Sequence, residues 1–251
     1  MIKKPDPDSL TLTGHLDELR SRLLSSLGFL LAGVLVSLFF ARQLAHFLTL
    51  PSRGIITQLV ITKPTESVVA YFKIALCCGF LIASPVLLYH AWQFFKPALR
   101  EKVSLWGWIL SGTLLFAGGT VFSYLVIVPM SLKILMGMSA GLATPFISLQ
   151  SYLSFVLSLT LLGGAMFEMP VAAALLTVAG VLSPDVMRCR RREAIFALCA
   201  AAAVLTPTTD IFSLLIFVIP MLVLYEASII VSRCVSRTAD PVPGEELYEK
   251  L

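Results

Sequence analysis

Long runs without a charged residue alternate with short polar segments along most of this chain. The uncharged runs cover residues 23–41, 74–95, 103–132, 134–167, 169–184, 194–209 and 211–225. Because a helix needs about 20 apolar residues to cross a bilayer, several of these runs are long enough to span one. The pattern predicts six membrane-spanning helices, at residues 22–41, 67–89, 104–129, 151–179, 193–206 and 211–231.

Prolines indicate where several of these spans begin or end. Pro129 is predicted to close the third span, and Ser183-Pro184-Asp185 is typical of a helix start. Pro207 leaves about 13 helical residues in the fifth span, or about 20 Å, against a hydrocarbon core of about 30 Å. We therefore expect the last two spans to be short.

The composition agrees with a membrane protein. Hydrophobic residues make up 57% of the chain, charged residues 14%, and the mean hydropathy is +0.89. A soluble domain carries about 25% charged residues, so these values exclude a soluble enzyme, a disordered chain and a secreted disulfide scaffold. The net charge of +4 is too small to indicate nucleic-acid binding.

Lys and Arg are unevenly distributed between the two sides of the predicted membrane domain. Fourteen of the 19 lie on the side of the termini, four lie on the other side, and Lys73 lies within a span. Since cytoplasmic loops carry the excess of Lys and Arg, both termini are predicted to be cytoplasmic. The arginine cluster at 188–192 is interpreted as part of this anchor rather than as an anion site. Residues 1–237 form the predicted membrane domain, and 238–251 an acidic, disordered tail.

We expect no cofactor, no metal and no catalytic activity. No nucleophile–base pair or phosphate-binding loop stands out in the sequence. The cysteines form no CxxC pair and have no metal-ligand spacing to a histidine. These residues are Cys77, Cys78, Cys189, Cys199 and Cys234, with His15, His46 and His90.

Glu168 is the only charged residue between Lys133 and Asp185. A carboxylate at the centre of a bilayer costs about 2.5–3.5 kcal/mol on insertion scales. We therefore expect Glu168 to face a wet or substrate-binding cavity, or to be a packing carboxyl that is hydrogen-bonded to a neighbouring helix. The first interpretation is favoured, because ionisable residues inside membranes are usually functional. Pro170 is predicted to kink this span.

Other acidic residues lie on the basic, cytoplasmic side. Glu18 and Glu101 are two carboxylates near one surface, and carboxylates bind guanidinium groups with paired hydrogen bonds. Taken alone, Arg100-Glu101-Lys102 is a self-neutralised loop. Glu226, near the end of the last span, either extends to the interface or pairs with an Arg or Lys.

A series of short motifs occurs along the chain in an order that resembles the TatC family, the multispanning core of the twin-arginine protein translocase. Each motif alone is weak, but the ordered set is specific. The motifs are His15-Leu16-Asp17-Glu18-Leu19-Arg20, Ser84-Pro85, Phe94-Phe95-Lys96-Pro97-Ala98-Leu99, Phe122-Ser123-Tyr124 to Pro129, Ser151-Tyr152-Leu153-Ser154-Phe155, Phe167-Glu168-Met169-Pro170, Leu205-Thr206-Pro207 with Asp210, and Leu224-Tyr225-Glu226.

The resemblance implies an all-α protein of six transmembrane helices in a curved, cup-like bundle, in a bacterial cytoplasmic (inner) membrane. It also implies a receptor for signal peptides that carry two consecutive arginines, on folded precursors that cross the membrane at the expense of the proton gradient. The implied partners are small single-span subunits of the TatA and TatB type, and further copies of the chain within a larger complex.

The family pattern also implies roles for residues at the cytoplasmic surface. Glu18 and Glu101 would receive the arginine pair, Phe94 and Leu99 would shape the site beside them, and Arg20 would support the geometry of the first helix. The first cytoplasmic loop is shorter than in the family pattern, so matching Glu101 to the family's glutamate needs a gap.

Within the membrane, the resemblance implies that Pro85 kinks the second span and that Glu168, with Pro170 beside it, is the polar spot of the concave face. It implies that the single-span subunits dock near the last outer turn and the last span. The family commonly has a glutamine at one of these positions, where this chain has leucine. The candidate positions are Thr206, Asp210, Leu214 and Glu226.

Two other functions are alternatives. A proton-coupled small-molecule transporter would use Glu168 as its relay, but the chain has no second titratable partner at mid-depth and no internal repeat. An insertase or assembly scaffold for membrane proteins would not distinguish Arg-Arg from Lys-Lys signals.

Overall fold

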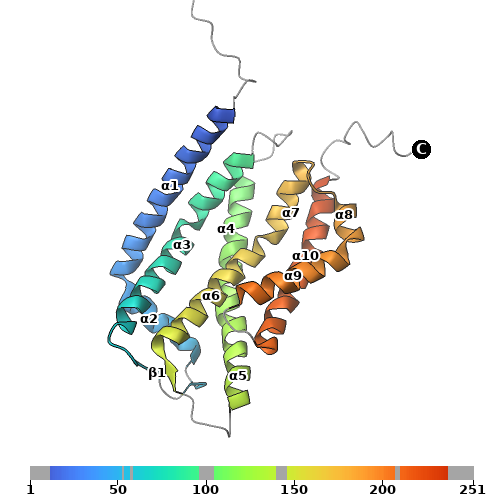
Figure 1. Cartoon of the computed structure of the whole chain (residues 1–251). Coiled ribbons are helices and arrows are strands. Elements are labelled where there is room, and N and C mark those ends of the chain that lie inside the picture. The colour runs from blue at the N-terminus through green and yellow to red at the C-terminus, as the bar shows by residue number, and fades with distance from the viewer. Residues whose placement is uncertain are drawn as a thin grey trace, which may run out of the picture.

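The computed structural model describes residues 12–52, 54–56, 59–95, 105–139, 146–206 and 210–236, and these are mostly helical (Figure 1). In chain order the elements are α1 (Leu12–Phe39), α2 (Ala41–Leu48), the 3-10 turn η1 (Leu50–Ser52), β1 (Leu59–Val60), α3 (Glu66–Phe95), α4 (Leu105–Phe122), the π-helical turn η3 (Ser123–Ile127), α5 (Val128–Ser139), β2 (Ile147–Ser148), α6 (Leu149–Phe167), α7 (Met169–Val178), α8 (Pro184–Cys189), α9 (Arg191–Leu205) and α10 (Ile211–Ser236).

Among the described residues, five helical segments are long and apolar enough to cross a membrane. The expectation of an apolar, helical membrane protein is therefore confirmed. The fifth predicted span corresponds to α9, whose 15 residues reach only about 22 Å. The five segments are Arg20–Phe39, Glu66–Gln93, Trp106–Met138, Leu149–Val178 and Ile211–Ser236.

The last helix is not short, so that part of the prediction is wrong. α10 has 26 residues and continues beyond the predicted end at residue 231. The hydroxyl groups of Ser232 and Thr177 lie 2.5 Å apart and join its end to α7. Arg233 lies in its last turn, where a cation interacts favourably with the helix dipole.

Pro129 does not close the third span, contrary to prediction. The helix continues through it into α5 and ends at Ser139. In an α-helix the ring of Pro129 would clash with the carbonyl of Leu125. Leu125 lies in the π-helical turn η3, which shifts the hydrogen-bonding register by one residue. The wide turn therefore accommodates the proline without ending the helix.

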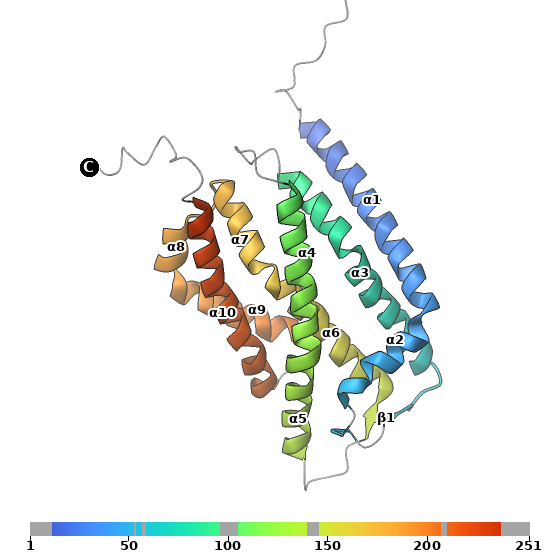
Figure 2. The ribbon, with the colours of Figure 1, turned by 180° about the vertical axis from the view of Figure 1, so that it is seen from behind.

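The helices α4 and α7 lie close together where α7 begins and separate toward one end of the molecule (Figures 1 and 2). We call this the terminal end, because it holds the first turn of α1 and the last turn of α10; the opposite one, with β1 and β2, is the sheet end. The contact between Thr177 and Ser232 joins the last turns of α7 and α10, so these two helices run parallel. The chain must therefore return toward the sheet end between them, and α9 is the helix that makes this return.

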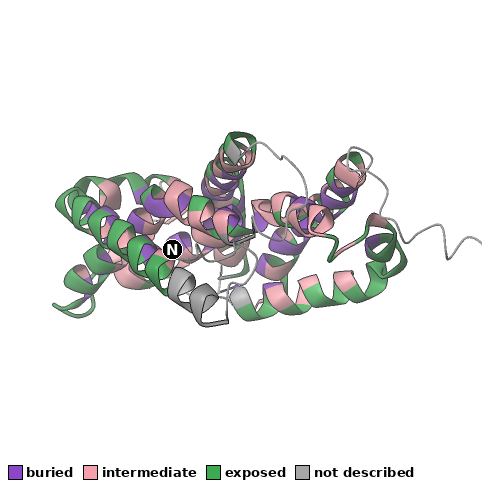
Figure 3. Ribbon diagram, turned by 90° about the horizontal axis from the view of Figure 1, so that it is seen from above, coloured by how far each residue is buried: buried purple, intermediate pink, exposed green. Residues whose placement is uncertain are grey.

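The buried side chains form two separate clusters. The larger lies mainly in the half of the molecule near the sheet end, where Ile74, Tyr152 and Phe217 are almost fully buried. A small cluster of Ala173, Met187, Tyr225 and Ile229 ties α8 to α7 and α10. Viewed from above, buried residues lie where helices meet and exposed ones cover the outward faces (Figure 3). The exposed faces are apolar, as lipid requires.

Two tyrosines close the sheet end. The hydroxyl of Tyr124 donates to the carbonyl of Phe47 (2.6 Å), and that of Tyr152 to the carbonyl of Leu48 (2.9 Å). These carbonyls belong to the last turn of α2, where no intrahelical donor is available. The short helix α2 is thereby fastened to η3 and α6.

Glycines allow two pairs of helices to approach closely. A Cβ atom on Gly119 of α4 would lie 2.6 Å from the carbonyl oxygen of Gly163 of α6. At the crossing of α1 and α3, a Cβ atom on Gly33 would lie 2.8 Å from the carbonyl oxygen of Gly79. Small residues at such crossings give membrane helices their packing energy.

The neighbouring glycines of α4 test this packing. Gly119→Val is expected to lower the free energy of unfolding by about 1–3 kcal/mol or more, because the side chain has no space against α6. Gly118→Val is the matched control, since nothing lies within 4 Å of a Cβ atom there. Thermal unfolding in detergent measures both variants. Equal stability of the two would contradict the assigned contact.

Candidate functional site

The fourth spanning segment breaks at Glu168. Pro170 lies in the first turn of α7 and has no backbone N–H to continue the hydrogen bonding of α6. The Glu168 N–H donates to Ala165 (3.2 Å), and its carbonyl accepts from Ala172 (2.8 Å). The break expected at Pro170 is therefore present. It allows α6 to pack against α4, and α7 to pack against α10.

The carboxyl group of Glu168 points toward α4 and α3. A Cβ atom on Gly112 of α4 would lie 3.3 Å from Glu168 Oε2 and 3.4 Å from Leu88 Cδ1 of α3. The missing side chain at Gly112 thus makes room for the carboxyl group. Glu168 Oε1 is buried and has no hydrogen-bond partner within the described part of the chain. A buried polar atom without a partner costs about 1–3 kcal/mol.

This geometry bears on the two interpretations of Glu168. A packing carboxyl would be hydrogen-bonded to a neighbouring helix, and Oε1 has no such bond among the described residues. The free-energy cost of burying Oε1 without a hydrogen bond favours the functional interpretation, in which the carboxyl group binds a partner. That role stays a prediction.

The two prolines assigned to the membrane differ in their surroundings. Pro170 lines a cavity between α4, α7 and α10. Pro85 lies inside α3, which continues through it. The hydroxyl of Ser84 donates to the carbonyl of Leu81 (2.7 Å), the group that a residue other than proline at position 85 would bond. The side chain before the proline thus supplies the missing donor.

The proposed arginine-binding residues lie toward the terminal end or outside the described residues. Arg20 is exposed on α1. Glu18 belongs to α1 and Phe94 to α3, but their side chains are outside the described part, as are Leu99 and Glu101 altogether. The first turn of α1 and the last turn of α3 lie at the terminal end. Their assignment as a site remains a prediction.

The candidate docking residues do not form one cluster. Thr206 is buried at the end of α9, and Asp210 caps α10, where its Oδ1 accepts from the N–H of Ser213 (2.7 Å). Leu214, one turn further, is half-buried. Glu226 lies about four turns along α10, toward the terminal end.

Glu226 forms an ion pair with Arg191, the first residue of α9 (2.7 Å). The pairing interpretation of this carboxylate is therefore confirmed. Both side chains are about half exposed (44% and 51%), so the pair contributes at most about 1 kcal/mol. The adjacent Tyr225 hydroxyl, which is buried, donates to the carbonyl of Met187 (2.8 Å). The two contacts fasten the corner between α8 and α9 to α10.

Several residues of this region were missed by the sequence analysis. Gly112 faces Glu168, and the Ser213 hydroxyl is buried without a hydrogen-bond partner among the described residues. Nothing in the sequence distinguishes Gly112 or Ser213 from the other small residues of the predicted spans. Within the described ranges, no three or more His, Cys, Asp or Glu side chains are grouped so that they could hold a metal ion.

Comparison with known proteins agrees with this arrangement. The sequence matches the family model described as Sec-independent protein translocase protein (TatC) over residues 14–220. The chain belongs to the TatC family. It is a membrane protein and a component of the Sec-independent protein translocase, not an enzyme.

TatC relatives match over most of their length. The chain is 37% identical to TatC of Aquifex aeolicus, covering 91% of this chain and 97% of that protein. It is also 37% identical to TatC of Listeria innocua, covering 92% and 95%. The chloroplastic TATC of Arabidopsis thaliana is 33% identical, over 88% of this chain and 66% of that protein.

The fold is that of a solved TatC structure. The crystal structure of the twin arginine translocase receptor TatC has a TM-score of 0.80 and 37% identity, and the match covers 89% of this chain and all of that one. The sequence resemblance to TatC is therefore confirmed. A translocase family also favours protein transport over the small-molecule transporter and insertase alternatives.

Substitution of Glu168 distinguishes its two interpretations. Glu168→Leu is expected to raise the free energy of unfolding by about 1–3 kcal/mol, because it removes a buried carboxyl group without a partner for Oε1. Glu226→Leu is the control, since it removes a paired carboxylate and gains nothing. Thermal unfolding in detergent compares the two. A loss of stability in Glu168→Leu would identify a packing carboxyl instead.

Proposed function

We propose that this chain is the receptor that binds twin-arginine signal peptides of folded precursors, and that Glu18 and Glu101 receive the two arginines. The observation that carries the proposal is the likeness to the solved twin arginine translocase receptor, at a TM-score of 0.80. The packing of α1 against α3 supports it, because the ends of these helices that carry Glu18 and Phe94 both lie at the terminal end. Leu99 and Arg20 complete the proposed site.

The proposed orientation places the terminal end in the cytoplasm. Arg188, Arg190 and Arg192 are exposed at this end, whereas Arg42 and Lys63 lie toward the sheet end. This distribution supports cytoplasmic termini in a bacterial inner membrane. α9 is then a membrane span, the fifth of six in chain order, and its length of about 22 Å requires a locally thinned bilayer.

The remaining steps of the proposed transport involve Glu168 and the connection between α9 and α10. Glu168 provides a polar group within an otherwise apolar bundle, where the signal peptide would be admitted once bound. Single-span subunits of the TatA and TatB type dock beside α9 and the start of α10, near Thr206, Asp210 and Leu214. The proton gradient drives the transport of the folded precursor, and further copies of the chain join the same complex.

Removal of either carboxylate tests the arginine site. Glu101→Gln and Glu18→Gln are each expected to weaken binding of an Arg-Arg signal peptide at least tenfold, about 1.4 kcal/mol, because a charge-assisted contact is lost. A fluorescent peptide titrated onto the purified protein gives the dissociation constant.

Glu193→Gln is the control, because it removes an exposed carboxylate of α9 that pairs with Arg190. A Lys-Lys peptide should bind the unaltered protein weakly, since lysine lacks the paired donors of arginine. Unchanged binding in both glutamate variants would disprove the assignment.

Labelling of single cysteines tests the orientation and whether α9 crosses the membrane, in a chain whose five native cysteines are replaced by serine. In intact cells, a membrane-impermeant maleimide should label Lys63→Cys and Thr208→Cys. Arg192→Cys, at the start of α9, should react only in opened cells. If Thr208→Cys also reacted only in opened cells, α9 would not cross the membrane.

A further inference from the structure

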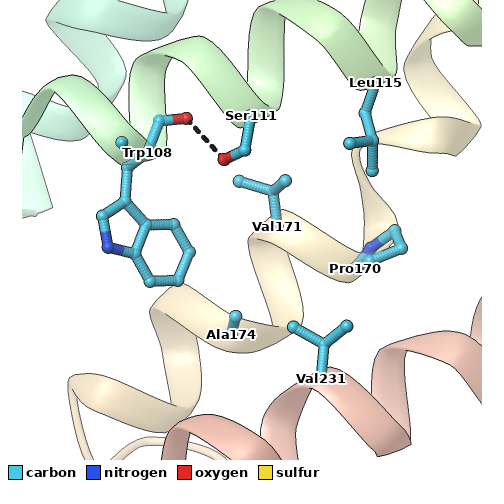
Figure 4. A pocket seen from close by; sticks show the side chains of 8 residues that line it. Trp108, Ser111, Leu115, Pro170, Val171, Ala174 and Val231 are labelled. Atoms are coloured by element: carbon cyan, nitrogen blue, oxygen red, sulfur yellow. Dashed lines mark hydrogen bonds between the residues drawn. The ribbon is translucent and has the colours of Figure 1, made fainter.

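A cavity of about 350 Å³ lies between α4 on one side and α7 with α10 on the other (Figure 4). None of its residues belongs to the arginine or docking sites proposed above, and only Pro170 was assigned a place beside Glu168. It lies between the start of α7 and the terminal end, where α4 and α7 separate. The lining residues are Gly107, Trp108, Ser111 and Leu115 of α4, Pro170, Val171 and Ala174 of α7, and Val231 of α10.

The wall of this cavity is apolar. Its one hydroxyl group, on Ser111, donates to the carbonyl of Trp108 in the same helix (3.0 Å; Figure 4). Apart from the indole N–H of Trp108, the wall offers a polar or charged occupant no side-chain group to replace the hydrogen bonds that it would lose with water. The cavity therefore favours an occupant made of hydrocarbon.

The cavity is too short to hold a helix. Toward mid-membrane its lining ends at Leu115 of α4 and Pro170 of α7, and beyond this level Gly119 and Gly163 bring α4 and α6 together. A partner helix about 10 Å across needs a groove that continues along its axis. A flexible hydrocarbon chain needs only the cavity itself, whose volume is at the lower end for small-molecule sites, about 300–1,000 Å³.

The surroundings toward the terminal end are those of a lipid headgroup region. Trp108 and the 78% exposed Trp106 lie in the first turn of α4, and tryptophan is enriched at membrane–water interfaces. Arg233 lies in the last turn of α10, two residues after Val231, so it is at about the same level of the membrane although on another face of the helix. A cation at this level attracts the anionic lipids of the cytoplasmic leaflet.

We propose that this cavity holds one acyl chain of a phospholipid, whose anionic headgroup lies near Arg233. The acyl chain fills the space between α4 and α7, which neither buried cluster occupies. It thereby sets the distance between these two helices. This site is independent of the arginine-pair assignment, since it involves neither Glu18 nor Glu101.

Filling the cavity tests the proposal. Ser111→Phe places a ring in the cavity and removes only a hydrogen bond within α4. Leu114→Phe is the matched control on the same helix, at a side chain that is 61% exposed. Native mass spectrometry of protein purified from membranes of phosphatidylglycerol and phosphatidylcholine counts the phospholipids retained. We expect the unaltered protein and Leu114→Phe to keep one more phospholipid than Ser111→Phe; equal counts would overturn the proposal.

Two further variants complete the test. Val171→Phe fills the cavity from the α7 side and should lose the same phospholipid, which keeps the proposal testable if Ser111→Phe does not fold. Arg233→Gln should keep the phospholipid but lose the preference for phosphatidylglycerol; an unchanged preference would overturn the headgroup assignment. Crosslinking of Ser111→Cys to a signal peptide would indicate a peptide site instead. Together with lipid retention that Ser111→Phe does not change, this result would overturn the proposal.

Discussion

The arrangement of the bundle depends on one missing hydrogen-bond donor, the backbone nitrogen of Pro170. In lipid, a backbone group that loses its helical partner finds no water to replace it, so the chain must rearrange locally. Here α6 ends at Phe167, α7 begins at Met169, and the carbonyl of Glu168 is taken up by Ala172. The change of direction divides the fourth span between two partners, α4 before the break and α10 after it.

This division explains why the two ends of the molecule differ. Toward the sheet end, η3, α6 and α3 share a large buried cluster, and two tyrosine hydroxyls fasten α2 above it. Toward the terminal end, α7 has left α4 for α10, and the small cluster around Tyr225 is buried between α7, α8 and α10. The closed end is a scaffold, and the open end is where the proposed peptide and lipid sites lie.

The carboxyl group of Glu168 lies at the boundary between these halves. Its Oε1 is buried without a hydrogen bond among the described residues, facing a glycine that leaves it room. Proteins keep such costly groups mainly where function needs them. The short helix α9, which we propose as a further span, would be a second departure from the most stable arrangement, because its length of about 22 Å is less than the thickness of a bilayer.

The prolines show how far local rules extend. Pro184 with Ser183 starts α8 as predicted, because Ser183 Oγ accepts from the N–H of Val186 (3.3 Å), a contact within four residues. Pro129 was wrongly predicted to end a helix, since its effect depends on the π-helical turn before it. The length of α10 was underestimated because its end is stabilised by contacts with α7 and α8, which are remote in sequence.

The sequence by itself determined the apolar spans, the uneven charge, the break at Pro170 and the resemblance to TatC, because each depends on residue type and local spacing. It singled out Glu168 as an isolated charge but not Gly112 opposite it, and it left open whether Glu226 pairs at all. Only the tertiary structure decided these partners and the cavity between α4, α7 and α10. The physical reason is that contacts and empty space between helices depend on their relative position, which no local pattern encodes.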